Sequence, residues 1–323
     1  MKMTNSLLTY ARETLEIELT EAQRLLSRLD DNFVRACELL LACTGKAVVS
    51  GIGKSGHIGK KIAASLASTG TPAFFVHPAE ALHGDLGMIG PQDVLIFISY
   101  SGRAKELDLI LPLLADSHIP VIAITGGLES PLALAAACVL DISVEHEACP
   151  MGLAPTSSAV NTLMMGDALA MALMRHRGFN AEDFARSHPG GSLGARLLNR
   201  VHHLMRTGDR LPVVNESDSV MEAMLELSRT GLGLVAVCDP NQRVVGVFTD
   251  GDLRRWLVKG GTLQQPLGGA ITRPGYRLPE QWRAGEALEA LHQHHISAAP
   301  VVNLDGKLVG AINLHDLHQA GVG

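Results

Sequence analysis

Residues 46–69 read KAVVSGIGKSGHIGKKIAASLAST, an apolar run followed by a glycine-rich turn and a segment that favours a helix. Gly51, Gly53 and Gly56 spell G-x-G-x-x-G, the layout of a dinucleotide-binding loop between a strand and a helix. Lys54 stands among these glycines, where a lysine has little structural reason to be. The stretch predicts an α/β fold and raises the question of which ligand the loop accommodates.

Short apolar runs alternate with helix-favouring segments from residue 46 to about residue 145. Such runs are typical of strands that are covered on both faces of a parallel sheet. They read KAVVSG (46–51), PAFFVH (72–77), DVLIFIS (93–99), PVIAIT (120–125) and VLDISV (139–144). The helices are expected at 56–69, 103–116, 130–137 and 157–177. The alternation predicts an α/β three-layer sandwich with a parallel sheet.

The C-terminal part of the chain repeats itself. VAVCDPNQRVVGVFTDGDL (235–253) aligns without a gap with APVVNLDGKLVGAINLHDL (299–317), at an offset of 64 residues. The identical pairs include Gly246/Gly310, Asp252/Asp316 and Leu253/Leu317. A shared register of this length predicts two copies of a small β-α-β-β-α unit that pack against each other.

These patterns divide the chain into five parts. We expect an N-terminal helix (1–32), an α/β domain (33–180), a loop-rich connector (181–202) and two repeat copies (203–262 and 268–323). Within the first part, a helix is predicted over 4–30, with apolar residues every seven positions at Leu8, Leu15, Ala22 and Leu29. It either packs on its own domain or forms an oligomer interface, and the pattern leaves both open.

Composition excludes several classes of protein. Of the 323 residues only 4% are aromatic, and the formal net charge is −6, which disfavours a nucleic-acid partner. The five cysteines are scattered without a C-x-x-C, so neither a disulfide framework nor a zinc knuckle is indicated. Glutamates occupy the place of a signal peptide's apolar core, and the longest apolar run, 132–140, is too short to span a membrane. We expect a cytoplasmic, reduced protein without a membrane partner.

The dinucleotide interpretation lacks its second element. An acidic residue should end the second strand, where it holds the ribose, but PAFFV is followed by His77 and Pro78, and Glu80 comes three residues late. A phosphate loop of the Walker A type is also excluded, because His57 stands where that motif requires lysine.

A second glycine turn, Ser99-Tyr100-Ser101-Gly102, ends the third strand and precedes the helix predicted at 103. Hydroxyls and free amides at a helix N-terminus suit a phosphate monoester. Ser55 would lie at the same edge of the sheet, where open α/β folds bind ligands. Helix capping alone would explain Ser101, but two such loops favour a small phosphorylated ligand.

The motifs SGIGKSG, SYSG and EACPMGLAPTSS, in this order, resemble the sugar isomerase (SIS) domain of phosphosugar isomerases, and the repeat with GVFTDGDL resembles a pair of CBS modules. Together they resemble the D-arabinose-5-phosphate isomerases over nearly the whole chain, most closely the glucitol-operon-associated form. The most specific stretch is SGIGKSGHIGKKIAASLASTGTPAFFVHPAEALHGDLGM.

This resemblance implies an activity. The family interconverts D-ribulose 5-phosphate and D-arabinose 5-phosphate through an enediol(ate), and supplies the precursor of 3-deoxy-D-manno-octulosonate for lipopolysaccharide. It implies a homotetramer and no required cofactor.

The resemblance also implies site residues. The catalytic positions would be Lys54, Glu106, Glu147 and His188. The substrate contacts would be Ser55, Gly70, Thr71, His83, Ser99 and Ser101. His77 resembles a position that takes an inhibitory zinc ion. His188 lies beyond the SIS core, so it would reach a neighbouring subunit's site.

The roles within this set stay partly open. Either Glu147 or His188 would be the base that takes the carbon-bound proton, and either Glu106 or His83 would move hydroxyl protons or open the sugar ring. Lys54 would stabilise the enediolate or the phosphate.

Each of these residues also has a plainer interpretation. Glu106 favours the start of a helix, Glu147 beside His146 is compatible with a surface pair, and His188 with a solvated histidine. Ala104 departs from the family's S-x-S-G-x-[ST] loop, and Arg103 beside it either compensates with charge or points to solvent.

CBS pairs bind adenine nucleotides through the pattern G-h-x-T-x-x-D. The first copy matches it at Gly246, Thr249 and Asp252. The second copy keeps Gly310 and Asp316 but carries Asn313 in place of threonine. An adenine or cytidine nucleotide effector is one interpretation, and a dimerisation module without a ligand is the other.

A function of another class is a non-catalytic regulator that senses a sugar phosphate, since SIS domains occur in both kinds of protein. A regulator should carry a DNA-binding helix-turn-helix, which the acidic N-terminal helix does not resemble. It would also have no need of the acids at 106 and 147, and both are present.

Overall fold

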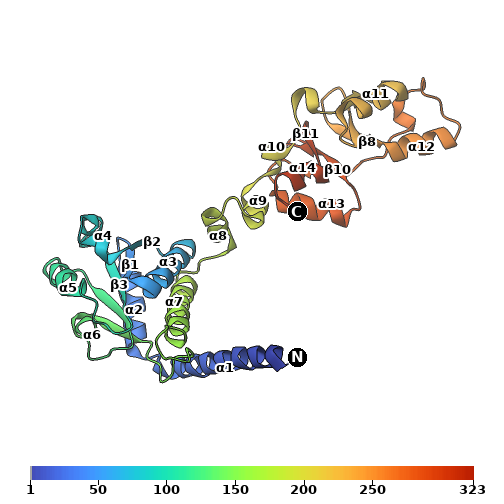
Figure 1. Cartoon of the computed structure of the whole chain (residues 1–323). Coiled ribbons are helices and arrows are strands. Elements are labelled where there is room, and N and C mark those ends of the chain that lie inside the picture. Colours follow the sequence, from blue (N-terminus) through green and yellow to red (C-terminus); the bar gives the residue numbers. More distant parts are fainter. Residues whose placement is uncertain (1) are drawn as a thin grey trace. The chain divides into compact units, whose positions relative to one another are not determined.

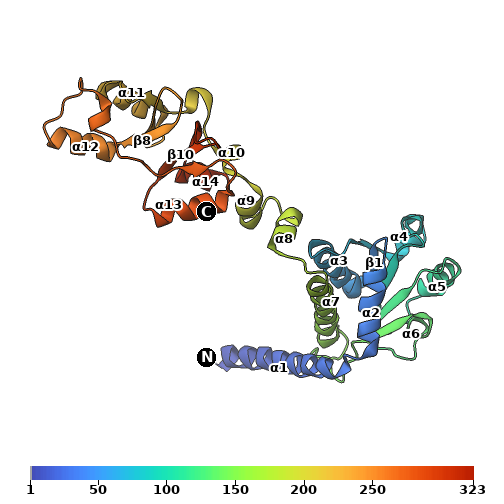
Figure 2. The same cartoon turned by 180° about the vertical axis from the view of Figure 1, so that it is seen from behind.

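The computed structural model describes residues 2–323, and side chains from Ser6 onwards. Met1, the first residue of the predicted N-terminal helix 1–32, lies outside the described residues. The chain forms two compact units, Met1–Asp183 and Phe184–Gly323 (Figure 1; Figure 2 gives the view from behind). None of the helices between Lys2 and Gly323 is long and apolar enough to cross a membrane.

The first unit contains a five-stranded parallel sheet in the order β2-β1-β3-β4-β5. Its strands are β1 (Ala47–Gly51), β2 (Ala73–Val76), β3 (Val94–Ile98), β4 (Val121–Thr125) and β5 (Cys138–Asp141). All five coincide with the apolar runs of the sequence to within a few residues. The predicted α/β fold with a parallel sheet is confirmed.

Helices cover both faces of this sheet, because its strands alternate between two apolar cores. On one face Val49 and Ile96 pack against α2 (Asp31–Ala42), α3 (Gly53–Ser68) and α7 (Ser157–His176). On the other, Val48 and Leu95 pack against α4 (Pro78–Ala81), α5 (Leu107–Asp116) and α6 (Pro131–Ala135). This is the three-layer sandwich that the nearly continuous apolar strands predict.

The N-terminal segment is a helix interrupted before residue 30. α1 (Lys2–Leu25) is followed by a short 3-10 turn (Leu26–Arg28), and Asp30 then caps α2 by accepting the amide of Asn32 at 2.9 Å. Ala22 and Leu25 are buried, and α1 packs on α7, whereas Leu15 is exposed. The C-terminal end of α1 therefore packs on its own domain, and its N-terminal part carries an exposed apolar face.

The second unit repeats one arrangement twice. The first copy runs β6 (Val213–Asn215), α11 (Val220–Thr230), β7 (Leu234–Cys238), β8 (Val244–Thr249) and α12 (Asp250–Val258). The second runs β9 (Leu278–Pro279), α13 (Ala284–Gln293), β10 (Ala298–Val302), β11 (Leu308–Asn313) and α14 (Leu314–Gln319). Each copy forms a three-stranded sheet, and the predicted β-α-β-β-α repeat is confirmed.

The segment before the first copy is more helical than the predicted loop-rich connector. It holds α8 (Ala181–Ser187), α9 (Ser192–Leu198) and α10 (Val201–Leu204). The Asn180 side chain caps α8 by accepting the amides of Glu182 and Asp183 at 2.8 and 3.1 Å. Glycine and small polar residues suggested a loop, but the residues outside these helices are confined to 188–191 and 199–200.

Candidate active site

The order of the strands places a ligand crevice beside β1. Chain connections leave β1 and β3 in opposite directions along the sheet, and open α/β sheets bind ligands at the carboxyl ends of strands at such a switch point. The GIGKSG turn follows β1, and the SYSG turn follows β3. Because β1 and β3 are hydrogen-bonded neighbours, Lys54 and Ser101 come from adjacent loops at this edge.

The glycines of the first loop are required by close packing and by the turn itself. Gly53 has φ +58°, a left-handed conformation that favours glycine. A β-carbon on Gly51 would lie 2.9 Å from the carbonyl oxygen of Ile98, and one on Gly56 would lie 2.6 Å from that of Gly51. The G-x-G-x-x-G pattern thus seats α3 directly on β1 and β3, which requires no dinucleotide.

Lys54 lies in the first turn of α3, and its side chain is exposed. That turn contains no acidic residue, and Lys54 makes no ion pair among the residues that the structure describes. A cation at the positive end of a helix dipole is unfavourable by about 0.3–1 kcal/mol. Folding therefore gives no reason for a lysine here, whereas an anionic ligand does.

The second loop offers backbone amides to an anion. Ser99 is half-buried and Ser101 exposed, and the Ser101 hydroxyl accepts the amide of Arg103 at 3.3 Å. The amides of 104–106 donate no hydrogen bond within the described chain. Consecutive free amides form a concave site that suits phosphate oxygens. These amides supply hydrogen-bond donors beside Ala104, the position at which the family's S-x-S-G-x-[ST] loop carries a hydroxyl.

The helix predicted from 103 begins only at Leu107, which corrects the sequence-based expectation. Gly102 has φ +63°, and its carbonyl oxygen accepts the amide of Leu132 at 3.4 Å, so the chain is not helical at that point. Glu106 consequently occupies the N-cap position of α5, half-buried at the carboxyl edge of β3.

Glu147 lies in the segment between β5 and α7, and it is held through one oxygen. Its Oε2 accepts the Thr156 amide at 2.7 Å, the Thr156 hydroxyl at 2.8 Å and the Ser158 amide at 3.3 Å. Oε1 accepts no hydrogen bond from the described residues. Burial raises the pKa of this carboxyl, but the hydrogen bonds from Ser158 and Thr156 outweigh it, so the pKa lies below the usual value of a glutamate. At neutral pH Glu147 is an ionised carboxylate with one oxygen free.

A hydrogen bond connects the Glu147 segment to the SYSG loop. The Tyr100 hydroxyl accepts the amide of Val144 at 3.2 Å. β5 lies two strands away from β3, so the segment after β5 turns back across the carboxyl edge towards the switch point. His77 and His83 follow β2 and lie at this edge too.

Other residues of the predicted set are placed elsewhere. Gly70 and Thr71 precede β2 and lie at the amino edge of the sheet, where Thr71 is 3% exposed. His188 belongs to the second unit, where its ring stacks on Phe184 with centroids 4.1 Å apart. Its Nδ1 lies 3.1 Å from the Phe184 carbonyl oxygen, and since that oxygen only accepts, Nδ1 is the donor of this bond and Nε2 is the acceptor of the neutral ring.

Thr156 and Ser158, the residues that hold Glu147, escaped the sequence interpretation. The signal was present, because PTSS (155–158) directly precedes a helix that starts at Ser157. Serine and threonine at this position usually cap the helix themselves, but here Glu147 receives the Thr156 and Ser158 amides.

The second unit contains a cavity of about 410 Å³ between the two copies. Its lining includes Thr249 and Gly251 from the first copy, and Tyr276 and Ser297 from the second. Thr272, which precedes Tyr276 in the chain and pairs with Val247 of β8, lines it too. Asp252 is only 4% exposed and is not among the lining residues. Its Oδ1 accepts the hydroxyl of the lining residue Thr272 at 2.7 Å.

The corresponding carboxylate of the second copy is engaged differently. Asp316 receives a bidentate hydrogen bond from Arg206, with Nε at 3.0 Å from Oδ2 and Nη2 at 2.9 Å from Oδ1. Arg206 pairs with Ala311 by backbone hydrogen bonds, as Thr272 pairs with Val247 in the first copy. An arginine thus stands at the place of a threonine and covers the second carboxylate.

No group of three or more histidine, cysteine, aspartate or glutamate side chains within residues 2–323 is arranged to hold a metal ion. The His77 Nδ1 accepts the Ala79 amide at 3.2 Å, so the proton of the neutral ring lies on Nε2. Zinc binding at His77 stays a prediction.

Comparisons with known proteins agree with these features. The SIS domain model matches residues 40–172, and the CBS domain model matches 201–259 and 269–323. Arabinose 5-phosphate isomerase GutQ of Escherichia coli K12 is 69% identical over 320 residues, which are 99% of this chain and 100% of that protein. Arabinose 5-phosphate isomerase KdsD of Salmonella typhi is 50% identical over 96% of this chain and 95% of its own.

A solved structure resembles the first unit. A protein of E. coli CFT073 in complex with arabinose 5-phosphate has a TM-score of 0.56 and 39% identity, covering 57% of this chain and 98% of that one. The two domain models and the full-length relatives agree with the resemblance of the motifs. The chain therefore belongs to the arabinose 5-phosphate isomerase family, with an SIS domain followed by a tandem pair of CBS domains.

Proposed function

We propose that this chain interconverts D-ribulose 5-phosphate and D-arabinose 5-phosphate by moving a proton between C1 and C2. The observation that carries the proposal is Glu147, an ionised carboxylate with one free oxygen. The segment that leads to Glu147 is hydrogen-bonded through Val144 to Tyr100 of the SYSG loop. This loop lies at the edge of the sheet where Lys54 also lies. The GutQ and KdsD relatives, which carry the name of this activity, match this chain over 99% and 96% of its length.

The arrangement supports a division of roles. A base takes a proton from C1 of the ketose, and an enediolate forms with its charge on O2. The base returns the proton to C2, while the O1 proton passes to O2, so that O1 becomes the aldehyde oxygen and O2 a hydroxyl. The free Oε1 of Glu147 suits the carbon base, although its lowered pKa makes it a weak one. His188, whose Nδ1 lies against the Phe184 carbonyl oxygen so that Nε2 is the acceptor of the neutral ring, remains the other candidate.

The phosphate and the oxyanion need positive partners. The free amides at 104–106 and the hydroxyls of Ser55, Ser99 and Ser101 suit the phosphate at the switch point. Lys54 then supplies the cation for the enediolate or for the phosphate. Glu106 at the start of α5 and His83 after β2 are the candidates for moving hydroxyl protons or opening the sugar ring.

The test is direct. The purified protein is incubated with ribulose 5-phosphate, and arabinose 5-phosphate is followed by NMR, with glucosamine and fructose phosphates as control substrates. We expect arabinose 5-phosphate to appear to an equilibrium that is also reached from the opposite side. Tight binding without turnover would instead identify a sugar-phosphate sensor.

A second proposal concerns an effector. We propose that an adenine or cytidine nucleotide binds in the 410 Å³ cavity, with its phosphate at the N-terminus of α12 near Thr249. Asp252 accepts the hydroxyl of the lining residue Thr272 and is also bonded to Arg255 and Thr249. It reaches a ribose hydroxyl when the nucleotide displaces the Thr272 hydroxyl from Oδ1. Asp316 stays with Arg206.

Titration calorimetry with AMP, ATP and a CMP-linked sugar checks this arrangement. We expect Asp252→Asn to weaken nucleotide binding at least about tenfold, since it removes one charged hydrogen-bond partner. The matched change in the other copy, Asp316→Asn, should leave the affinity within about twofold. The opposite order of effects would assign the nucleotide to the second copy, and absence of heat would favour a module without a ligand.

The setting of the enzyme follows from the same resemblance. We propose that it works in the cytoplasm and supplies the precursor of 3-deoxy-D-manno-octulosonate, in lipopolysaccharide synthesis or beside glucitol metabolism. We also propose a homotetramer, for which the exposed leucines of α1 offer an apolar face.

A further inference from the structure

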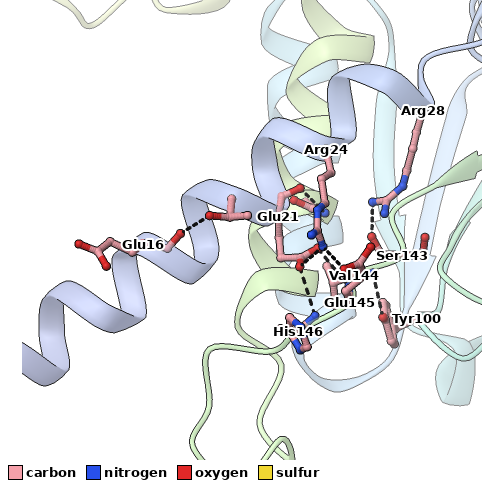
Figure 3. A network of polar contacts seen from close by, with 11 residues as sticks. Glu16, Glu21, Arg24, Arg28, Tyr100, Ser143, Val144, Glu145 and His146 are labelled. Carbon is pink, nitrogen blue, oxygen red and sulfur yellow. Dashed lines mark hydrogen bonds and ion pairs between the residues drawn. The ribbon is translucent and has the colours of Figure 1, made fainter.

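The backbone that leads to Glu147 is held by side chains from distant parts of the chain. Asp141 accepts the amide of Ser143 at 2.8 Å, and Tyr100 accepts the amide of Val144 at 3.2 Å. The next two amides, of residues 145 and 146, both donate to Glu21 (Figure 3). Residues 143–146 form no regular secondary structure. Their four successive amides therefore donate to side-chain acceptors and not to backbone carbonyl groups.

Glu21 uses one carboxylate oxygen for each of its two amides. Oε2 lies 3.1 Å from the Glu145 nitrogen, and Oε1 lies 3.2 Å from the His146 nitrogen. The side chain is only 1% exposed, although it belongs to the otherwise largely exposed α1. Burying a carboxylate costs free energy unless it is paired and hydrogen-bonded. The two amides supply hydrogen bonds that offset this cost for Glu21.

An arginine completes the contact. Arg24, one turn further along α1, places Nη1 2.9 Å from Oε1 of Glu21 and 2.6 Å from Oε2 of Glu145. Figure 3 shows Arg24 between these two carboxylates, with the 143–146 segment alongside α1. The cation balances the buried charge and ties the segment to the helix a second time.

Glu147 thus stands between two anchors. Its carboxylate is held at the start of α7 by Thr156 and Ser158, while the backbone that precedes it is held on α1 by Glu21. We propose that Glu21 is a positioning residue of the isomerase reaction, which fixes the place of Glu147 through the amides of residues 145 and 146. This inference rests on the proposed role of Glu147 as a group that acts on the substrate.

Both oxygens must be acceptors for this arrangement to hold. In Glu21→Gln the side chain keeps its size, but one of the two positions becomes an NH₂ group that faces a backbone N–H. The segment must then shift, and a misplacement of about 1 Å at a reacting group costs on the order of 10²-fold in rate. The free amides of 104–106, which suit the phosphate, lie in the loop after β3, whose bond to the segment is made by the Tyr100 hydroxyl.

We therefore expect Glu21→Gln to lower kcat for ribulose 5-phosphate by about 10- to 100-fold, with KM changed less than about threefold. Glu21→Asp keeps both acceptors on a shorter stem and should recover part of the lost kcat. Glu16→Gln is the matched control, because Glu16 is exposed on the same helix (Figure 3), and it should leave both constants unchanged.

A double-mutant cycle with Glu147→Gln separates positioning from a general structural role. If Glu21 acts through Glu147, adding Glu21→Gln to Glu147→Gln should lower the remaining kcat less than about twofold. An equal loss in both backgrounds, or an unchanged kcat for the single variant, would overturn the proposal. Should Glu21→Gln fail to fold, the same cycle is run with Glu21→Asp, where the same two outcomes decide.

The cycle also separates this inference from the proposed function. A wild-type protein that binds the sugar phosphate without turnover would overturn the isomerase function, and the role of Glu21 with it. An active wild type whose two substitutions combine additively would overturn only the role of Glu21.

Discussion

Replacing Lys54 with alanine is expected to lower kcat/KM for ribulose 5-phosphate by about 10²–10³-fold, because a preformed cation beside a developing oxyanion is worth several kcal/mol. The same change should leave the melting temperature unchanged or raise it slightly. Lys54 opposes the dipole of α3 and pairs with no acid in the first turn. Loss of activity together with equal or greater stability is the signature of a residue retained for function.

Steady-state kinetics and a thermal melt of the same preparation check both halves of this expectation. Lys60→Ala is the matched control, since Lys60 is exposed on the same helix and its Nζ lies 5.5 Å from the centroid of the Phe75 ring. The control should keep its activity. A folded Lys54→Ala protein with near-normal turnover would remove Lys54 from the mechanism.

Glu147→Gln is the second change with a large expected effect. The substitution keeps the shape of the side chain but removes the charge, so it should lower kcat by about 10²–10⁴-fold, the usual contribution of a general base. KM should change much less, because the phosphate loops after β1 and β3 stay intact. Glu129→Gln, an exposed glutamate in the loop after β4, serves as the control.

The pH dependence of kcat/KM adds an independent measurement. Because hydrogen bonds lower the pKa of Glu147 from the usual range of a glutamate, its base form persists at neutral and mildly acidic pH. Activity lost between pH 5 and 7 in the wild type would therefore report another group, such as a histidine with an ordinary pKa of about 6.5. Full activity of Glu147→Gln would assign the carbon proton to His188.

The sheet was predictable because its chemistry is local. Each buried strand of a parallel sheet must be apolar on both faces, so the runs at 94–98 and 121–125 are visible without a structure. The β-α-β-β-α repeat was also predictable from the sequence, because the two copies align without a gap and share identical residues at equivalent positions. The resemblance of the motifs then indicated the family that the comparisons show.

The start of α5 was not predictable, because it depends on a distant contact. Residues 103–106 read RAKE, which favours a helix, but the carbonyl group of Gly102 is bonded to the amide of Leu132. The role of Glu21 is hidden for the same reason, since its two partners lie 124 and 125 residues away along the chain. Thr71 shows a third limit: a motif assigns a residue to a site without saying at which edge of the sheet it lies.

The main-chain contacts of Gly51 and Gly56 also bear on the robustness of the protein to mutation. Through them α3 rests on β1 and β3 by main-chain atoms, with no side chain as a spacer at that point. The position of Lys54 therefore does not depend on the size of side chains elsewhere on the helix. Substitutions of the outward-facing residues of α3 should leave the position of the Lys54 ammonium group unchanged. A single added methyl group at Gly51 or Gly56, in contrast, should displace the start of α3 and Lys54 with it.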